Sequence, residues 1–518
     1  MKRNPDLGEP EQYELAIPKP TSLIESLRAV GYSVATAIAD IVDNSITANA
    51  ANIWITFHWD GPRSAITILD DGKGMSEAML LEAMRPGTQS PLEERLPSDL
   101  GRFGLGLKTA SFSQCRSLTV ASKESGSGHS TRRWDLDYVE SHNEWRLLRG
   151  ADEGARPYIE DLDDLPSGAL VLWRKLDRIV DHRPATDESA HEVFRNLIEE
   201  VKEHLSMTFH RFISGQAKQV AKPLNIYVNG RTKSHLLPAW DPFLKSHPAT
   251  QKSPEEIIGS GAYSVRIQGF VLPHKDRLSE EQYREAGGPR GWNAQQGFYI
   301  YRNDRILVPG DWLRLGRNKV WQKEEHYRLA RLSIDISNAV DFEWSLDVKK
   351  STARPPLRLR DRLTDLAEGV RQDARSVFFH RGEMGVRPGR RQSNPMERPW
   401  IAAERAGHMT YKVNRSHTVV AGVLRRVGPL SDEVDAMLRV IEETVPVERI
   451  WLDAAEQPGG HATPYEGLDQ ASIMADLKKA LQYLKQAGYS TPTAIEYLRS
   501  VEPFNRYAYA IDKMKDEA

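Results

Sequence analysis

Apolar positions recur with two different spacings in the first 215 residues of the chain. Helical spacing over residues 21–33 and 34–50 predicts two amphipathic helices. Alternating apolar and polar residues over 52–59 and 64–70 predict two strands. The same patterns predict further strands at 117–122, 132–139 and 169–176, and a long helix at 191–209. This region is therefore expected to be a mixed domain of helices and strands.

The pattern breaks down between the second predicted strand and residue 101. The stretch from about Met75 to Leu100 is polar and contains glycine and proline. Such a composition favours a mobile loop that includes a short helix.

A second set of alternating segments begins near Lys218 and predicts a small α+β domain. Asn229-Gly230 separates two such segments, which is the commonest short hairpin signal. Further strands are predicted at 263–273, 297–308, 331–340 and 342–351. A long helix is predicted at 354–379, and residues 381–399 form a linker rich in Arg, Pro and Gly.

The last section is predicted to be mainly helical, with helices at 432–445 and 473–488. One apolar stripe in the second of these helices indicates a core or partner contact. Its members are Ile473, Leu477, Leu481 and Leu484. Together the patterns predict an α+β chain divided into regions 1–215, 216–360, 361–400 and 401–518.

Composition narrows the classes of protein that fit. The 518 residues carry a formal net charge of -2, so any contact with nucleic acid must be a local patch. The single Cys115 excludes a disulfide framework and suits a reducing, cytoplasmic location. No apolar run approaches the ~20 residues of a membrane helix, so no membrane partner is expected.

The first candidate for chemistry is the motif ADIVDNSITANA, where Asp40 and Asn44 lie one helical turn apart. A carboxylate and an amide on one helix face can position a water and ligate Mg²⁺ through oxygen. Taken alone, the motif fits equally well a polar residue pair on a solvated face.

The second candidate is ILDDGKGM, where a predicted strand runs into Asp70, followed by Gly72 and Gly74. Glycines permit a sharp turn and the close approach of a flat ligand. A carboxylate at the end of a strand can accept a hydrogen bond from an exocyclic amine such as that of adenine. An ordinary turn is the alternative interpretation.

The third candidate is GRFGLGLKTA. It has the glycine spacing of a Walker A loop, but Leu107 displaces Lys108 and Thr109 by one residue. Glycines before a helix leave backbone N–H groups free to bind an anion, and Lys108 adds a positive charge. Phosphate binding therefore does not require Walker geometry here.

In this order and at these intervals, the three motifs resemble those of the GHKL ATPase superfamily: gyrase B, Hsp90, histidine kinases, MutL and the MORC proteins. The resemblance implies a GHKL (Bergerat) α/β sandwich over residues 1–215 that binds ATP and Mg²⁺. It makes Asp40 the general base, Asn44 the Mg²⁺ ligand and Asp70 the acceptor of the adenine amine. The other nucleotide-binding residues that it implies are Ala48, Gly72, Gly74, Met75, Gly101, Phe103, Gly104, Leu105, Gly106, Leu107 and Lys108.

Two positions depart from the family pattern. The base of the family is normally Glu, and Asp40 is shorter by one methylene, or roughly 1.5 Å. Slow hydrolysis is therefore expected, because misplacement by ~1 Å can lower a rate about 10²-fold. The family also usually carries Thr where this chain has Ala169, which lacks the hydroxyl that helps to read adenine.

Residues 216–360 resemble the S5-like transducer domain of MORC and MutL-type ATPases. The segment DVKKS would supply a lysine to the γ-phosphate, either Lys349 or Lys350. The MORC resemblance implies an ATP-gated dimeric clamp that acts on DNA without sequence preference, in restriction or anti-phage defence. A basic tract offers phosphate contacts for such a role, or else a solvated helix and linker. It comprises Arg354, Arg358, Arg360, Arg362, Arg371, Arg375, Arg387, Arg390 and Arg391.

Two other functions remain open. One is a nucleotide-gated scaffold that hydrolyses little ATP and recruits a nuclease or helicase partner through its helical C-terminal region; Asp40 and Ala169 favour it. The other is an Hsp90-like chaperone, which the middle section fits less closely.

Overall fold

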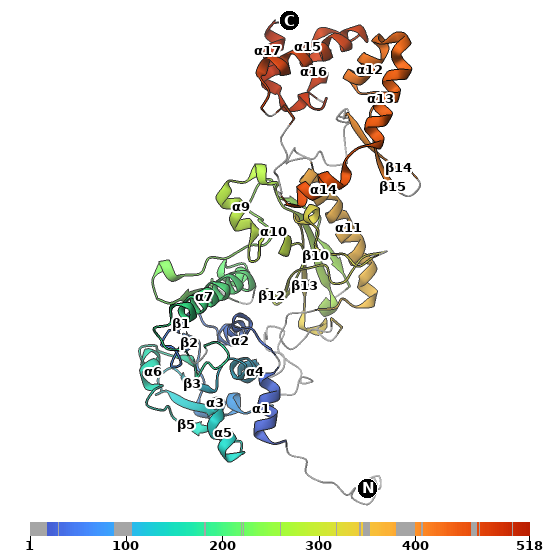
Figure 1. Ribbon diagram of the computed structural model, residues 1–518. Coiled ribbons are helices and arrows are strands. Elements are labelled where there is room, and N and C mark those ends of the chain that lie inside the picture. The colour runs from blue at the N-terminus through green and yellow to red at the C-terminus, as the bar shows by residue number, and fades with distance from the viewer. Residues whose placement is uncertain are drawn as a thin grey trace, which may run out of the picture. The chain divides into compact units, whose positions relative to one another are not determined.

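The computed structural model describes two compact units, one within Met1–Gly385 and one within Val386–Ala518 (Figure 1). The described residues are 18–29, 31–87, 106–180, 183–218, 220, 222–259, 261–317, 319–340, 343–344, 353–379, 399–405, 408–456, 464–465, 467–499 and 501–517. Within them, no helix combines the length and apolar character needed to cross a bilayer.

The first unit contains a seven-stranded sheet with the order β5-β4-β3-β6-β2-β1-β7. Its strands are β1 (Asn52–His58), β2 (Ala65–Asp70), β3 (Ser117–Lys123), β4 (Ser130–Asp135), β5 (Leu148–Arg149), β6 (Gly168–Arg174) and β7 (Asn225–Val228). Neighbours pair antiparallel except β1 and β7, which are parallel.

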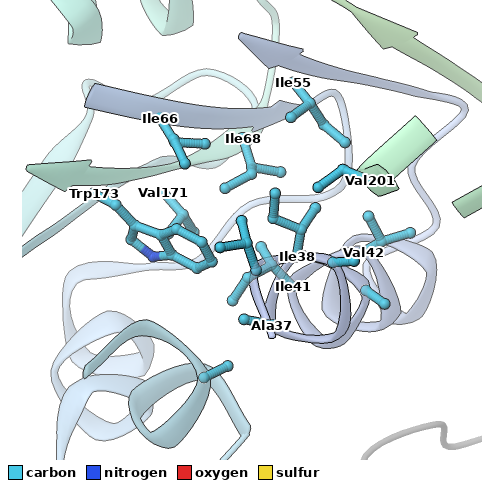
Figure 2. Close-up of a cluster of buried hydrophobic side chains, with 14 of the residues drawn as sticks. Ala37, Ile38, Ile41, Val42, Ile55, Ile66, Ile68, Val171, Trp173 and Val201 are labelled. Carbon is cyan, nitrogen blue, oxygen red and sulfur yellow. The ribbon is translucent and has the colours of Figure 1, made fainter. Parts of the chain in front are cut away.

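Helices cover both faces of this sheet, because alternate residues of its central strands are apolar on both sides. On one face, α2 (Val34–Thr47) and α7 (Glu188–Thr208) bury side chains against Ile66 and Ile68 of β2, as Figure 2 shows. On the other face, α6 (Arg156–Asp163) packs with Ala65 and Leu69. The expected α/β sandwich is therefore present.

Shorter helices surround this sandwich: α1 (Pro20–Arg28), α3 (Glu77–Met84), α4 (Gly106–Phe112), α5 (Leu136–His142) and α8 (His210–Ile213). The strand predicted over 132–139 is wrong in its second half. Asp135 ends β4, and its carboxylate accepts the N–H groups of Asp137 and Tyr138, which starts α5 instead.

The hairpin predicted at Asn229-Gly230 is also wrong. The segment before the turn is β7, which pairs with β1 of the first sheet, and beyond the turn Leu236 makes only an isolated bridge to Tyr227. The side chain of Asn229 accepts the N–H of Phe57 at 2.8 Å, which ties the turn to β1. The first sheet thus extends past residue 215.

A second sheet in the same unit has the order β12-β11-β13-β10-β8, with β9 also paired to β10. Its strands are β8 (Gln251–Lys252), β9 (Glu256–Ile258), β10 (Val265–Val271), β11 (Gly297–Arg302), β12 (Arg305–Asp311) and β13 (Ala330–Ile336). The long helix α11 (Leu357–Phe379) buries Leu359, Leu363 and Ala367 in the core of this sheet. Helices α9 (Glu280–Gly287) and α10 (Gly291–Ala294) complete the region. Most of the strand predicted over 342–351 lies outside the described residues.

The second unit is rich in helices, as predicted, but it begins with a hairpin that the sequence did not suggest. The hairpin joins β14 (Trp400–Arg405) to β15 (His408–Val413). The helices are α12 (Thr418–Arg426), α13 (Ser431–Glu443), α14 (Val447–Glu456), α15 (Gln470–Gln486), α16 (Thr491–Leu498) and α17 (Ala508–Glu517). The predicted stripe on α15 is buried against α16 and α17, which confirms a core role.

Candidate functional site

Helix α2 carries the first polar motif and turns its apolar side to the sheet. The helix starts after Ser33, whose hydroxyl accepts the N–H of Thr36 at 3.2 Å. Asp40 and Asp43 are buried, with 4% and 2% of their surface exposed, whereas Asn44 is exposed. One helix therefore holds two buried carboxylates beside an accessible amide.

Both oxygens of the Asp40 carboxylate are engaged. The hydroxyl of Tyr32 donates to Oδ2 at 3.0 Å, and Nη2 of Arg305 donates to Oδ1 at 3.4 Å. The same guanidinium donates from Nε to Oδ1 of Asp43 at 2.8 Å. Arg305 begins β12, so the second sheet supplies a cation to the first motif. Sequence reasoning missed Arg305, and also Asp43, although Asp43 stands inside the quoted motif.

Asp70 lies at the end of β2 and is linked directly to α2. The hydroxyl of Ser45 donates to Oδ2 at 2.7 Å, and the N–H of Gly72 donates to Oδ1 at 2.9 Å. Burial raises the pKa of the Asp70 carboxyl, while the donors Ser45, Gly72 and Ala169 oppose that shift. Sequence reasoning missed Ser45. Its hydroxyl donates a hydrogen bond to Asp70, whereas Ala169 has no side-chain hydroxyl that could do so.

Close packing explains why glycines follow Asp70. A Cβ atom at Gly72 would lie 2.8 Å from the Cβ of Ala48, whose carbonyl accepts the N–H of Lys73. Gly74 has φ +70°, and a Cβ there would lie 2.0 Å from the carbonyl oxygen of Lys123. The half-buried Met75 follows and donates its N–H to Ser122 at 2.8 Å. These contacts hold the turn after β2 against the end of α2.

The third motif is described from Gly106 onward. A Cβ added at Gly106 would lie 3.9 Å from Oδ2 of Asp40, which sets the start of α4 beside the first motif. Leu107 packs against the core of the first sheet. The buried ammonium of Lys108 donates to the carbonyl of Ala83 at 3.0 Å, and burial lowers the pKa of Lys108 to about 8. Gly101, Phe103, Gly104, Leu105, Lys349 and Lys350 lie outside the described residues.

The predicted basic tract divides into exposed and buried members. Arg358 and Arg362 are exposed and pair with Glu343 and Glu256, each at 2.6 Å. The Arg371 guanidinium is 4% exposed and stacks on Trp312, Trp321 and Tyr327, so its expected role as a phosphate contact is wrong. Arg387, Arg390 and Arg391 lie outside the described part of the chain.

The three motifs thus meet on one side of the first sheet, although up to 68 residues separate Asp40 from Lys108 in the sequence. They combine a buried carboxylate at the end of β2, a second carboxylate on α2, an exposed amide, and a glycine at the first turn of α4. Oxygen ligands of this kind suit Mg²⁺, and a buried carboxylate with neutral donors suits an amine.

Comparison with known proteins identifies the same region. Residues 32–165 match the family described as histidine kinase-, DNA gyrase B-, and HSP90-like ATPase. The ATPase morc-1 of Caenorhabditis elegans is 32% identical over 90 residues, which cover 17% of this chain and 10% of that protein. The chain therefore spans about a tenth of the length of this curated relative.

Among solved structures, the chain is similar to the N terminal domain of a DNA repair protein. The likeness covers 68% of this chain and 98% of that one, at 14% sequence identity and a TM-score of 0.39. The matched residues 32–165 contain five of the seven strands of the first sheet, β1 to β5. Residues 32–165 thus carry a domain of the histidine kinase-, DNA gyrase B-, and HSP90-like (GHKL) ATPase type, and the chain has a distant similarity to a MORC ATPase.

Proposed function

We propose that the chain binds Mg-ATP at this site and hydrolyses it slowly. One observation carries the proposal, namely that three motifs distant in sequence converge around α2. Ser45 bonds Asp70 at 2.7 Å on one side of the helix, and Gly106 approaches Asp40 on the other.

Asp70 has the surroundings needed to accept an adenine amine. A carboxylate offers about four lone-pair positions, and Ser45, Gly72 and Ala169 donate to this one. Capacity for a ligand N–H remains. In this proposal the hydroxyl of Ser45 orients Asp70 in the absence of a threonine at position 169.

Asp40 would act as the general base, and Asn44 would hold Mg²⁺ through its amide oxygen. The exposure of Asn44 leaves its amide accessible, and Mg²⁺ would offset the phosphate charge there. The donors on both oxygens of Asp40 fix the direction of its carboxylate.

The phosphates would be held by residues 101–108, together with Lys349 or Lys350. The ammonium of Lys108 donates to the carbonyl of Ala83, and an ammonium has three N–H donors, so a phosphate could accept another of them. A phosphate near Lys108 would favour the charged form of a lysine whose pKa burial has lowered to about 8.

We further propose that ATP binding closes two copies of the chain into a dimer that acts on DNA. This dimer would have a role in restriction or anti-phage defence. The distant similarity to the ATPase morc-1 and the exposed Arg358 and Arg362 on α11 support this proposal. The second candidate function is a gated scaffold with little hydrolysis that recruits a nuclease or helicase. The buried ion pair of the short Asp40 side chain favours it.

Calorimetric titration of the full chain with Mg-ATP tests the proposal. Asp70→Asn should weaken binding by at least about tenfold, because an amide cannot replace a charged acceptor without loss. Asp71→Asn is the matched control, since that carboxylate bonds the backbone of Ala51 and Asn52. Absence of saturable binding by the wild type, or equal affinities for Asp70→Asn and Asp71→Asn, would contradict the assignment.

A further inference from the structure

The tip of the β11–β12 hairpin reaches the site from the second sheet. Asn303 and Asp304 both have left-handed backbone conformations, with φ of 48° and 65°, which produces a tight reversal. Arg305 follows as the first residue of β12 and is only 4% exposed. A long cationic side chain is thus buried at a junction between two sheets.

The guanidinium of Arg305 binds two carboxylates that lie three residues apart on α2. The shorter bond, Nε to Asp43 at 2.8 Å, anchors it. The rigid fork then brings Nη2 to 3.4 Å from Asp40, while Nη1 donates to the carbonyl of Ile306 at 3.2 Å. Asp43 therefore anchors the guanidinium of Arg305, and the guanidinium in turn orients the carboxylate of Asp40.

A separate set of contacts holds the hairpin tip in place. Asp304 accepts Nη1 of Arg211 at 3.0 Å and the N–H of Lys218 at 2.9 Å. Arg211 follows α7 and also pairs with Asp335 of β13. The backbone at the hairpin tip is thus held by contacts outside α2, whereas the guanidinium of Arg305 is anchored on α2 by Asp43.

We infer that Arg305 is a positioning residue for the catalytic carboxylate of Asp40, supplied by the second sheet and anchored by Asp43. The inference rests on the proposed hydrolysis. A buried carboxylate needs oriented donors to keep one direction, and Arg305 and Tyr32 supply one to each oxygen of Asp40. The ATPase site is therefore completed by a residue 265 positions away from its base.

Steady-state ATP hydrolysis and calorimetric ATP binding by the full chain test this role. Arg305→Gln should lower kcat by at least about tenfold and leave the Kd for Mg-ATP within about threefold, since Arg305 orients the base and not the nucleotide. Arg305→Lys should restore part of kcat, because a single ammonium keeps the charge but not the fork.

Asp43→Asn extends the test to the anchor. It should also lower kcat, and adding Arg305→Gln to it should change kcat little further, because both changes remove one interaction. If circular dichroism melts show that Arg305→Gln does not fold, the kcat and Kd values of Arg305→Lys and Asp43→Asn are compared with those of the wild type instead.

Arg331→Gln is the matched control, because Arg331 is a buried arginine of the second sheet that bonds the carbonyl of Pro242 and the hydroxyl of Tyr299. It is paired with Gly297, at the opposite end of β11 from the hairpin tip. The kcat of this variant should stay within about threefold of the wild type. Equal losses in Arg331→Gln and Arg305→Gln, without rescue by Arg305→Lys, would mean that Arg305 acts only as a structural contact, and would overturn the inference. A wild type that turns over, and is unaffected by Arg305→Gln, overturns the inference alone. A wild type without turnover overturns the proposed hydrolysis and this inference with it.

Discussion

At the scale of single residues, Lys108 links burial to the pH dependence of stability. Its folded pKa of about 8 lies below the ordinary 10.5, so the charged form is disfavoured in the folded state. The resulting penalty is fully present below pH 8 and fades as the pH rises toward 10.5. Relative to Lys108→Met, the wild type should therefore gain about 2 kcal/mol of unfolding free energy between pH 7 and pH 10.

Urea denaturation at the two pH values checks this expectation. Lys73→Met, which removes an exposed ammonium from the same unit, is the control. A stability difference between wild type and Lys108→Met that does not change with pH would show that the Lys108 ammonium is not buried as described.

Gly74 offers a second prediction at this scale. Alanine there must adopt φ near +70° and place its Cβ on the carbonyl oxygen of Lys123. Gly126 has a similar φ of +81° but no atom within 4 Å of the added Cβ. Gly74→Ala should thus cost about 2 kcal/mol more than Gly126→Ala in chemical denaturation, because the added Cβ overpacks the site. Equal costs would mean that backbone conformation alone requires glycine at position 74.

Some of these residues were accessible to sequence reasoning and others were not. Asp70 and Gly74 stand in one short motif, so a local pattern was enough to select them. Arg305 contacts Asp40 only through the fold, and nothing in its own surroundings in the sequence indicates a site. Ser45 was visible but had no known partner until the end of β2 was placed beside α2.

At the scale of elements, substitutions on α11 test whether its exposed arginines contribute to DNA binding. Replacing Arg358 and Arg362 with Gln should weaken binding and reduce the salt dependence of the logarithm of the affinity by about two units, one per phosphate contact. Arg371→Met should leave both unchanged, because that guanidinium is buried among aromatic rings. Fluorescence anisotropy over a salt series measures the slopes, and equal effects of the two changes would contradict this assignment.

Helices and strands were predicted well where the apolar pattern runs over many consecutive residues. Helices α2, α7, α11 and α15 and most strands of both sheets follow the apolar pattern. The prediction failed where a side chain or a distant strand decided the outcome. Asp135 caps α5 inside an alternating segment, and β7 pairs with β1, which lies far from it in the sequence. A single sequence shows neither competing interaction.

At the scale of the whole molecule, the candidate site draws on both sheets of the first unit. Asp70 ends β2 of the first sheet, Asp40 and Asn44 lie on α2, which packs against that sheet, and the second sheet brings Arg305 to α2. His210 and Tyr301 add a buried bond of 2.8 Å between the regions that carry the two sheets. This arrangement predicts that hydrolysis depends on the second sheet as well as on the matched family domain.

Steady-state Mg-ATP hydrolysis by the wild type and Asp40→Asn, each with and without DNA, tests the central claim most directly. The wild type should turn over slowly, DNA should change that rate, and Asp40→Asn should lower it by about 10² or more while ATP still binds. Equal rates in wild type and Asp40→Asn, despite measurable ATP binding, would contradict the role of Asp40 and favour the gated scaffold.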